Sequence, residues 1–177
     1  LTVSKYFTFL SSFAFVGLLL ALSLLTVNND GNLSANSLAL RRKASLIGLI
    51  WFFSSFTYNI ATLADILGVR FTDALDMTTV RSFVTQVIIG QYLFAQTLVA
   101  FLAGYLILRV KRVIPTLALL LISLVAIAAP ALESHSASGG SHALATGSML
   151  LHVAGLTLWA GGLFALMFIS PEDRKMA

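Results

Sequence analysis

The sequence contains no cysteine, which excludes disulfides, cysteine-ligated zinc sites and iron–sulfur clusters. Any metal site must therefore use histidine, methionine, carboxylate or backbone ligands. Charge is also scarce, because charged residues make up 10% of the chain, whereas soluble domains carry about a quarter. Hydrophobic residues make up 58%, and the mean hydropathy is +0.94. This composition excludes a water-facing surface over most of the chain and indicates an integral membrane protein.

The net charge of +4 does not indicate a nucleic-acid partner. The lysines and arginines stand in short clusters between apolar runs, where such residues determine membrane topology. We therefore expect the lipid bilayer, and no nucleic acid, as the main surroundings of this protein.

The apolar runs predict an all-α fold, a polytopic bundle of about five transmembrane helices that forms a single domain over residues 1–177. A helix needs about 20 residues to cross the hydrocarbon core. The predicted spans are 6–27, 44–67, 83–108, 113–130 and 146–169. The first run is longer than the core of a signal peptide, and no A-x-A cleavage site follows it, so we interpret it as a retained helix.

Basic residues predict the orientation, because cytoplasmic connections are rich in Lys and Arg. The larger sets follow spans one, three and five, and only three basic residues stand on the other side. The N-terminus is therefore predicted outside and the C-terminus in the cytoplasm. The outer connections are then 68–82, with a short interfacial helix, and 131–145. The residues of the larger sets are Arg41, Arg42, Lys43, Arg109, Lys111, Arg112, Arg174 and Lys175.

All three histidines of the chain lie close together. His135 and His142 belong to the outer connection, and His152 lies about two turns inside the last span. Met149 precedes His152 by three residues, so both positions share one face of a helix. Imidazole and thioether ligands without cysteine suit copper: His with Met accommodates Cu(I), and His with an oxygen donor such as Glu133 accommodates Cu(II). Zinc is also chemically allowed with three histidines.

Each of these residues has a plainer interpretation. A histidine near the membrane interface can hydrogen-bond a neighbouring helix, a loop histidine is usually solvated, and methionine commonly fills gaps between helices. Their convergence on one end of one helix favours a metal site. We therefore predict His135, His142, His152 and Met149 as the metal ligands.

Polar residues inside spans two and three are candidates for lining a transport path. Their simplest role is interhelical hydrogen bonding. Asp65 is the exception, because a carboxylate near the membrane boundary attracts cations. These residues are Ser54, Ser55, Tyr58, Asn59, Thr62, Asp65, Gln86, Gln91, Tyr92 and Gln96.

Residues 134–166 resemble the copper resistance protein D (CopD) family, more narrowly its actinobacterial version, which is often fused to a cytochrome c oxidase assembly domain. The family places a loop histidine before a span of the form H-L-x-A-A-x-x-W-x-G-G-L. Here His152, Trp159, Gly161 and Gly162 match the span. The loop element is matched by Ser134-His135-Ser136, and Ser141-His142-Ala143 is similar to the second loop histidine of the actinobacterial branch.

The resemblance implies a multi-pass protein of the inner (plasma) membrane that transports or binds copper, as Cu(I) or Cu(II), in copper homeostasis or resistance. It implies a copper site at the extracytoplasmic mouth. It also implies, as candidate partners, a periplasmic or extracellular copper chaperone or the cytochrome c oxidase assembly machinery. Family members usually have more spans, so the chain is expected to be the front portion of a longer protein.

Two other functions compete with this one. A haem-binding electron-transfer subunit needs two histidines on facing helices, whereas only His152 falls within a predicted span. A metal-free structural or assembly subunit predicts that the histidines are dispensable. An enzyme is not expected, because the sequence shows neither paired carboxylates at matching depth nor a nucleophile–base pair.

Overall fold

The structure is a computed structural model that describes residues 1–28, 30–34, 37–133 and 142–168, with the backbone alone at 131–133 and 142–146. Its long helices are each long and apolar enough to cross a membrane, which confirms the all-α fold with five spans. The elements in chain order are α1 (Thr2–Leu25), α2 (Ser37–Leu67), the 3-10 turn η1 (Asp73–Leu75), α3 (Met77–Gln86), α4 (Ile88–Leu106), α5 (Val113–Glu133) and α6 (His142–Phe168).

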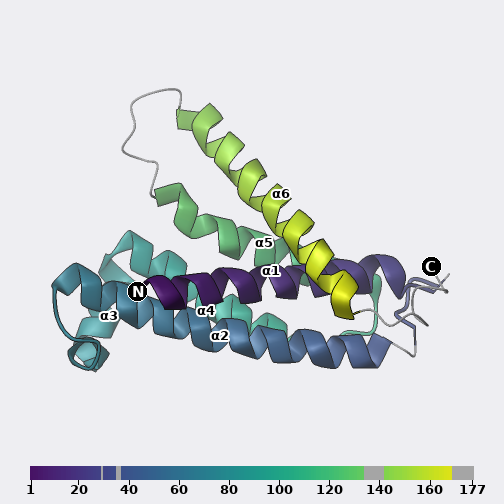
Figure 1. Cartoon of the computed structure of the whole chain (residues 1–177), viewed down its shortest axis with the longest axis horizontal. Helices are drawn as coiled ribbons and strands as arrows, with labels where there is room; N and C mark the ends of the chain where they lie inside the picture. The colour runs from purple at the N-terminus through teal and green to yellow at the C-terminus, as the bar shows by residue number, and fades with distance from the viewer. Residues whose placement is uncertain (29, 35–36, 134–141, 169–177) are drawn as a thin grey trace.

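Helix α1 lies at the centre of the fold, in contact with α2, α5 and α6, and α4 closes the other side by packing on α2 and α5 (Figure 1). Of the most apolar 18 residues in α1, 67% are buried, against 17% in α6. The core follows the three-and-four spacing that helix packing requires, with Phe15, Leu19 and Leu22 of α1 fully buried. Outward-facing side chains such as Ile114 and Val125 are also apolar, as a lipid-facing surface requires.

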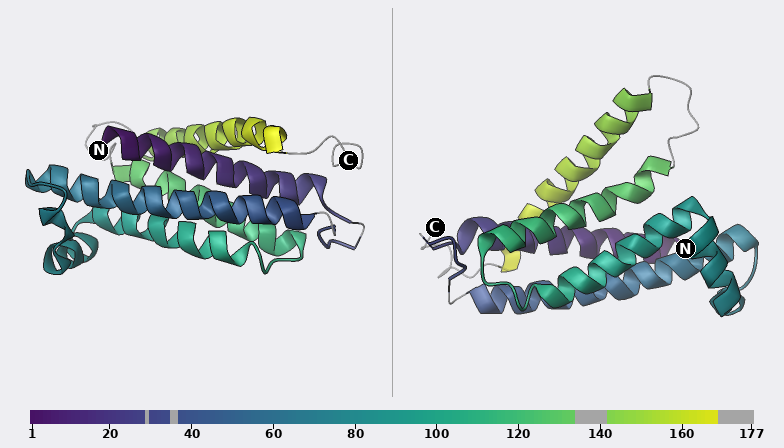
Figure 2. Two further views of the ribbon diagram at one scale, coloured as in Figure 1. Left: turned by 60° about the horizontal axis from the view of Figure 1, so that its bottom comes forward. Right: turned by 180° about the vertical axis from the view of Figure 1, so that it is seen from behind.

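Helices α5 and α6 lean away from the other helices toward the end where residues 134–141 connect them (Figures 1 and 2). At their opposite ends they pack closely. Gly161 of α6 lies directly on the backbone of α1 at Phe13 and Gly17. Gly48 of α2 and Gly104 of α4 make a second close contact, because a Cβ on Gly104 would lie 3.1 Å from the Gly48 Cα. Small residues thus hold the bundle together on one half of its length.

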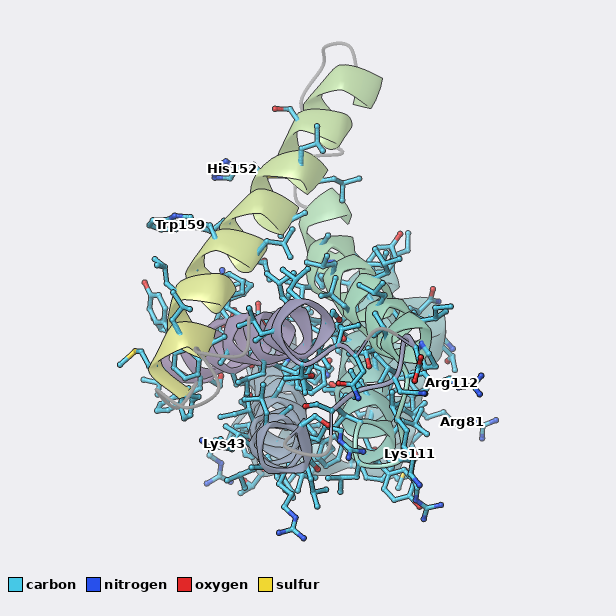
Figure 3. The ribbon with its side chains drawn as sticks, turned by 90° about the vertical axis from the view of Figure 1, so that its right-hand side faces the viewer. Lys43, Arg81, Lys111, Arg112, His152 and Trp159 are labelled. Carbon is cyan, nitrogen blue, oxygen red and sulfur yellow. The ribbon has the colours of Figure 1, made fainter. Side chains whose placement is uncertain are left out.

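The basic residues after spans one and three meet at this closely packed end, which we call the basic end. Arg41 donates from Nη1 to the Val110 carbonyl oxygen at 2.8 Å, and Lys43 Nζ donates to the Phe168 carbonyl oxygen at 3.0 Å. Cations at helix C-termini satisfy carbonyls that the helix leaves free. Figure 3 views the molecule from this end, with Lys43, Lys111 and Arg112 labelled.

The predicted third span, 83–108, is wrong at its start. Val87 is extended (φ −108°, ψ 120°) and separates α3 from α4, so the span begins at Ile88. Phe83 belongs to α3, where its ring is buried against Gly90 of α4. The apolar run continues through this change of direction, and hydropathy alone does not detect it. The short helix expected in 68–82 is present as η1 and α3.

Other helix ends also lie a few residues from the predicted ones. Helix α2 begins at Ser37 rather than at 44, because the Ser37 hydroxyl donates to the Ser34 carbonyl oxygen and the helix includes the basic residues beyond the apolar run. The predicted fourth span, 113–130, coincides with the candidate membrane span Val113–Pro130, and the helix itself continues past Pro130 to Glu133.

Candidate functional site

The end of the bundle where α1 begins, which we call the N-terminal end, contains a cavity of about 320 Å³ to which all five spans contribute. It lies where α5 and α6 lean away from α1, so the divergence of these helices creates the space (Figure 2). Its lining residues are Lys5, Thr8 and Phe9 of α1, Tyr58 of α2, Ile89, Leu93 and Gln96 of α4, Ile127 and Pro130 of α5, and Met149 and Val153 of α6.

Gln96 is the most informative polar residue in this lining. Its side chain is 3% exposed, yet its amide forms no hydrogen bond with any residue that the structure describes. Thr8, by contrast, donates its hydroxyl to the Ser4 carbonyl oxygen at 2.9 Å. Gln96 therefore offers the cavity both a free donor and a free acceptor.

Met149 faces this cavity and His152 does not. The Met149 thioether is the one sulfur in the lining, whereas the His152 side chain is exposed and absent from the lining. Figure 3 shows His152 and Trp159 on the side of α6 that faces away from α5. Three residues on a helix are separated by about 60° around its axis, and packing against α1 and α5 turns Met149 inward and His152 outward. The structure therefore does not bring these two predicted ligands together.

The other two predicted ligands lie outside what the structure describes. His135 falls among the undescribed residues, and at His142, the first residue of α6, only the backbone is described. Their roles stay predictions. Among the described residues, no three histidine, aspartate or glutamate side chains come together as a metal-binding group.

Four buried hydroxyls lie one helical turn deeper than the cavity lining, on four different helices. Ser12 and Thr157 donate to the carbonyl oxygens of Phe9 and Val153 in their own helices. The hydroxyls of Ser55 and Ser123 have no partner among the described residues. Two of these hydroxyls are thus left without the hydrogen bond that a buried polar group normally has.

An apolar layer follows below the hydroxyls. Phe15 and Trp51 are fully buried, and their ring centroids are 5.6 Å apart. Ala100, Leu119 and Leu120 are buried in the same core cluster. The cavity is therefore closed toward the basic end by an aromatic plug, by which we mean Phe15 and Trp51.

Some of the polar residues predicted in spans two and three form interhelical hydrogen bonds, and others line the cavity. Asn59 Nδ2 donates to Thr97 Oγ1 at 2.7 Å, and the hydroxyls of Ser54 and Ser11 are 3.2 Å apart, which confirms interhelical hydrogen bonds. Tyr58 and Gln96 line the cavity instead, as expected for the other role considered for these residues, the lining of a path. Asp65 is exposed and does not line the cavity.

Two other hollows differ from the central cavity in chemistry. One, of about 300 Å³, lies between α1 and α6 at Gly17, Trp159 and Gly162. The other, of about 310 Å³, lies among phenylalanines of α2, α3 and α4. Both are lined almost wholly by carbon, as grooves that face lipid are. The central cavity is therefore the better candidate site for a polar solute.

Comparison with known families gives a match to the N-terminal domain of copper resistance protein D-like proteins over residues 1–144. This range includes α1 to α5 and the connection to α6, and thus the greater part of the cavity lining. No curated protein and no solved structure matches the chain.

Proposed function

The chain belongs to the copper resistance protein D-like family, and on that premise we propose that it binds copper in its central cavity and passes it across the membrane. The family is one of membrane proteins named for copper resistance, and the five spans fit a multi-pass protein. The observation that carries the proposal is that Met149, a soft sulfur donor, lines a cavity to which all five spans contribute.

The side chains around this cavity include donor atoms that suit both oxidation states of copper. A thioether prefers Cu(I), whereas the oxygens of Gln96, Tyr58 and Thr8 are harder donors that also accept Cu(II). Lys5 stands at the mouth, but its side chain is exposed, so water screens its charge. We propose Met149 as the ligand that captures the ion and the oxygen donors as the groups that it meets next.

The predicted histidine ligands enter the proposal through the connection between α5 and α6. Both helices contribute to the cavity, through Pro130 and Met149, and the connection between them contains His135 and ends at His142. Positions 142 and 149 are seven residues apart, which is nearly two turns, so they fall on the same side of α6. We propose that His135 and His142 deliver copper to Met149. A copper chaperone or oxidase assembly machinery on that side is the proposed partner.

His152 requires a separate arrangement, because its side chain is exposed on α6. A copper ion or haem held there would need a ligand from another helix outside the described chain. The proposal therefore assigns His152 a smaller effect on copper binding than Met149. It assigns the chain binding and transport, at the inner membrane, rather than catalysis.

The test is a titration of the purified chain in detergent with Cu(I) and, separately, Cu(II), against a competing chelator. Met149→Leu is expected to weaken Cu(I) binding by at least about tenfold, since it removes the soft donor and keeps the volume. Met167→Leu is the matched control, because Met167 lies on the same helix but is 80% exposed.

The histidine variants divide the remaining possibilities. His135→Ala and His142→Ala are expected to lower the rate at which the chain binds copper. His152→Ala is expected to leave the copper affinity close to that of the unmodified chain. If Met149→Leu binds copper as tightly as Met167→Leu does, the cavity is not the copper site. Loss of binding on His152→Ala alone would instead place copper on the outer face of α6.

A further inference from the structure

The two unpaired hydroxyls beneath the cavity point to a path for water. Ser55 lies three residues before Tyr58 on α2, and Ser123 lies four residues before Ile127 on α5. Tyr58 and Ile127 both line the cavity, so each covers a hydroxyl one turn below it on its own helix. The neighbouring hydroxyls of Ser12 and Thr157 are satisfied by carbonyl oxygens of their own helices. The hydroxyls of Ser55 and Ser123 therefore differ from them in lacking a hydrogen bond among the described residues.

We propose that the central cavity is filled with water and that this water enters transiently as far as the hydroxyls of Ser55 and Ser123, where the aromatic plug stops it. Both hydroxyl oxygens expose less than 1 Å² and have no partner among the described residues. Water therefore reaches them only when Tyr58 or Ile127 moves aside. The Gln96 amide, which lines the cavity and has no partner among the described residues, is the polar group that the resident water satisfies.

The physical reason is the cost of unpaired polar groups in a membrane. Each buried hydroxyl without a partner is destabilising, and lipid offers no hydrogen bond to relieve it. A water molecule can donate to one hydroxyl and accept from another, and buried water typically makes about three such bonds. The Trp51 indole Nε1, also buried and unpaired among the described residues, lies four residues below Ser55 on the same face of α2. It belongs to the plug itself and is the polar atom at which the path ends.

This inference concerns water and holds whether or not the cavity binds copper. The absence of cysteine allows a direct test by single-cysteine labelling in detergent. The probe is a small, negatively charged methanethiosulfonate, which Lys5 at the mouth does not repel. The variants are Gln96→Cys in the cavity wall, and Ser55→Cys and Ser123→Cys in the hydroxyl layer.

Thr97→Cys is the matched control. Thr97 is 5% exposed and adjacent to Gln96, but it lines the apolar hollow on the other side of α4 and its hydroxyl is paired with Asn59 and Leu93. Gln96→Cys is expected to react fastest. Ser55→Cys and Ser123→Cys are expected to react more slowly, yet at least about tenfold faster than Thr97→Cys, as transient opening requires.

The covering role of Tyr58 has its own test. Adding Tyr58→Ala to Ser55→Cys is expected to raise the labelling rate toward that of Gln96→Cys. The two serine variants lie on separate helices, so misfolding of one, seen by size-exclusion chromatography, leaves the other informative. Equal rates for both serine variants and Thr97→Cys would overturn the path, and an unreactive Gln96→Cys would overturn the water-filled cavity itself. Neither result depends on copper, so each is distinguishable from failure of the copper titration.

Discussion

Gly17 of α1 and Gly161 of α6 meet backbone against backbone: a Cβ on Gly161 would lie 2.9 Å from the Gly17 nitrogen and 3.1 Å from its Cα. Because backbone atoms cannot move aside as a flexible side chain can, Gly161→Ala must push α6 away from α1. We expect a loss of stability of about 1–3 kcal/mol, typical of overpacked sites, measured as a lower midpoint of thermal unfolding in detergent.

Gly155 provides the control for this change. It lies on the same helix, and a Cβ built on it has no atom within 4 Å among the described residues. Gly155→Ala is therefore expected to leave the midpoint unchanged or to raise it slightly, since alanine favours helix over glycine. An equal decrease in both variants would show that the Gly17–Gly161 contact is not what holds α6.

The contact between Arg41 and the end of α4 predicts a second stability effect. The Arg41 guanidinium donates to the Val110 carbonyl oxygen at 2.8 Å, beyond the last turn of α4, so Arg41→Gln removes a charged hydrogen bond worth roughly 1.5–3 kcal/mol. Arg42→Gln removes the same charge from an exposed neighbour and is expected to change stability by less than about 0.5 kcal/mol. Chemical unfolding in detergent measures both, and equal effects would indicate that only net charge matters.

The cap of α3 predicts a pH effect at the N-terminal end. The Thr79 backbone N–H, and then the Thr79 hydroxyl, both donate to the Asp76 carboxylate at 2.9 Å, and these bonds hold the pKa of Asp76 below its usual 3.8. When folding lowers the pKa of a carboxyl group, that group stabilises the folded helix at pH values above its pKa in the unfolded chain. This stabilisation is lost as the pH falls through the pKa of the folded state. The protection of the α3 backbone amides against hydrogen exchange should therefore decrease below about pH 4.

Amide hydrogen exchange in α3 measures this change, with variants compared at the same pH. Asp76→Asn retains a capping oxygen without a titrating proton, so its exchange should lose the pH-dependent step. Asp76→Ala should exchange faster than the unmodified chain at neutral pH. A pH step that persists in Asp76→Asn would assign the titration to another group.

The basic end predicts the orientation of the chain in the membrane. Arg41, Lys43 and Lys111 gather there, and cytoplasmic ends are rich in such residues. In intact cells a membrane-impermeant maleimide is expected to label Met77→Cys, which replaces a 79% exposed residue of α3, and to label Lys111→Cys only after lysis. The reverse pattern would place the cavity mouth in the cytoplasm.

Much of this architecture can be predicted from the sequence, because the hydropathy of a whole segment indicates whether its surroundings are lipid or water. The five spans follow from the apolar runs, and the clusters around Arg41 and Arg109 correctly group the ends that the structure brings together. Hydropathy does not predict the break at Val87, because Phe83 and Ile88 are both apolar and only the directions of the helices that contain them differ. The interhelical role of Asn59 is predictable because lipid offers an amide no alternative partner.

The sequence by itself determined a cysteine-free five-span bundle and its basic end. Only the tertiary structure decided that Met149 faces a cavity while His152 faces outward, and that Gln96 lines this cavity without a partner among the described residues. A span that is apolar on all sides gives no periodic signal for its inner face. That choice is made by which neighbours pack against the helix, here α1 and α5 against α6, and by the divergence of α5 and α6 that opens the cavity.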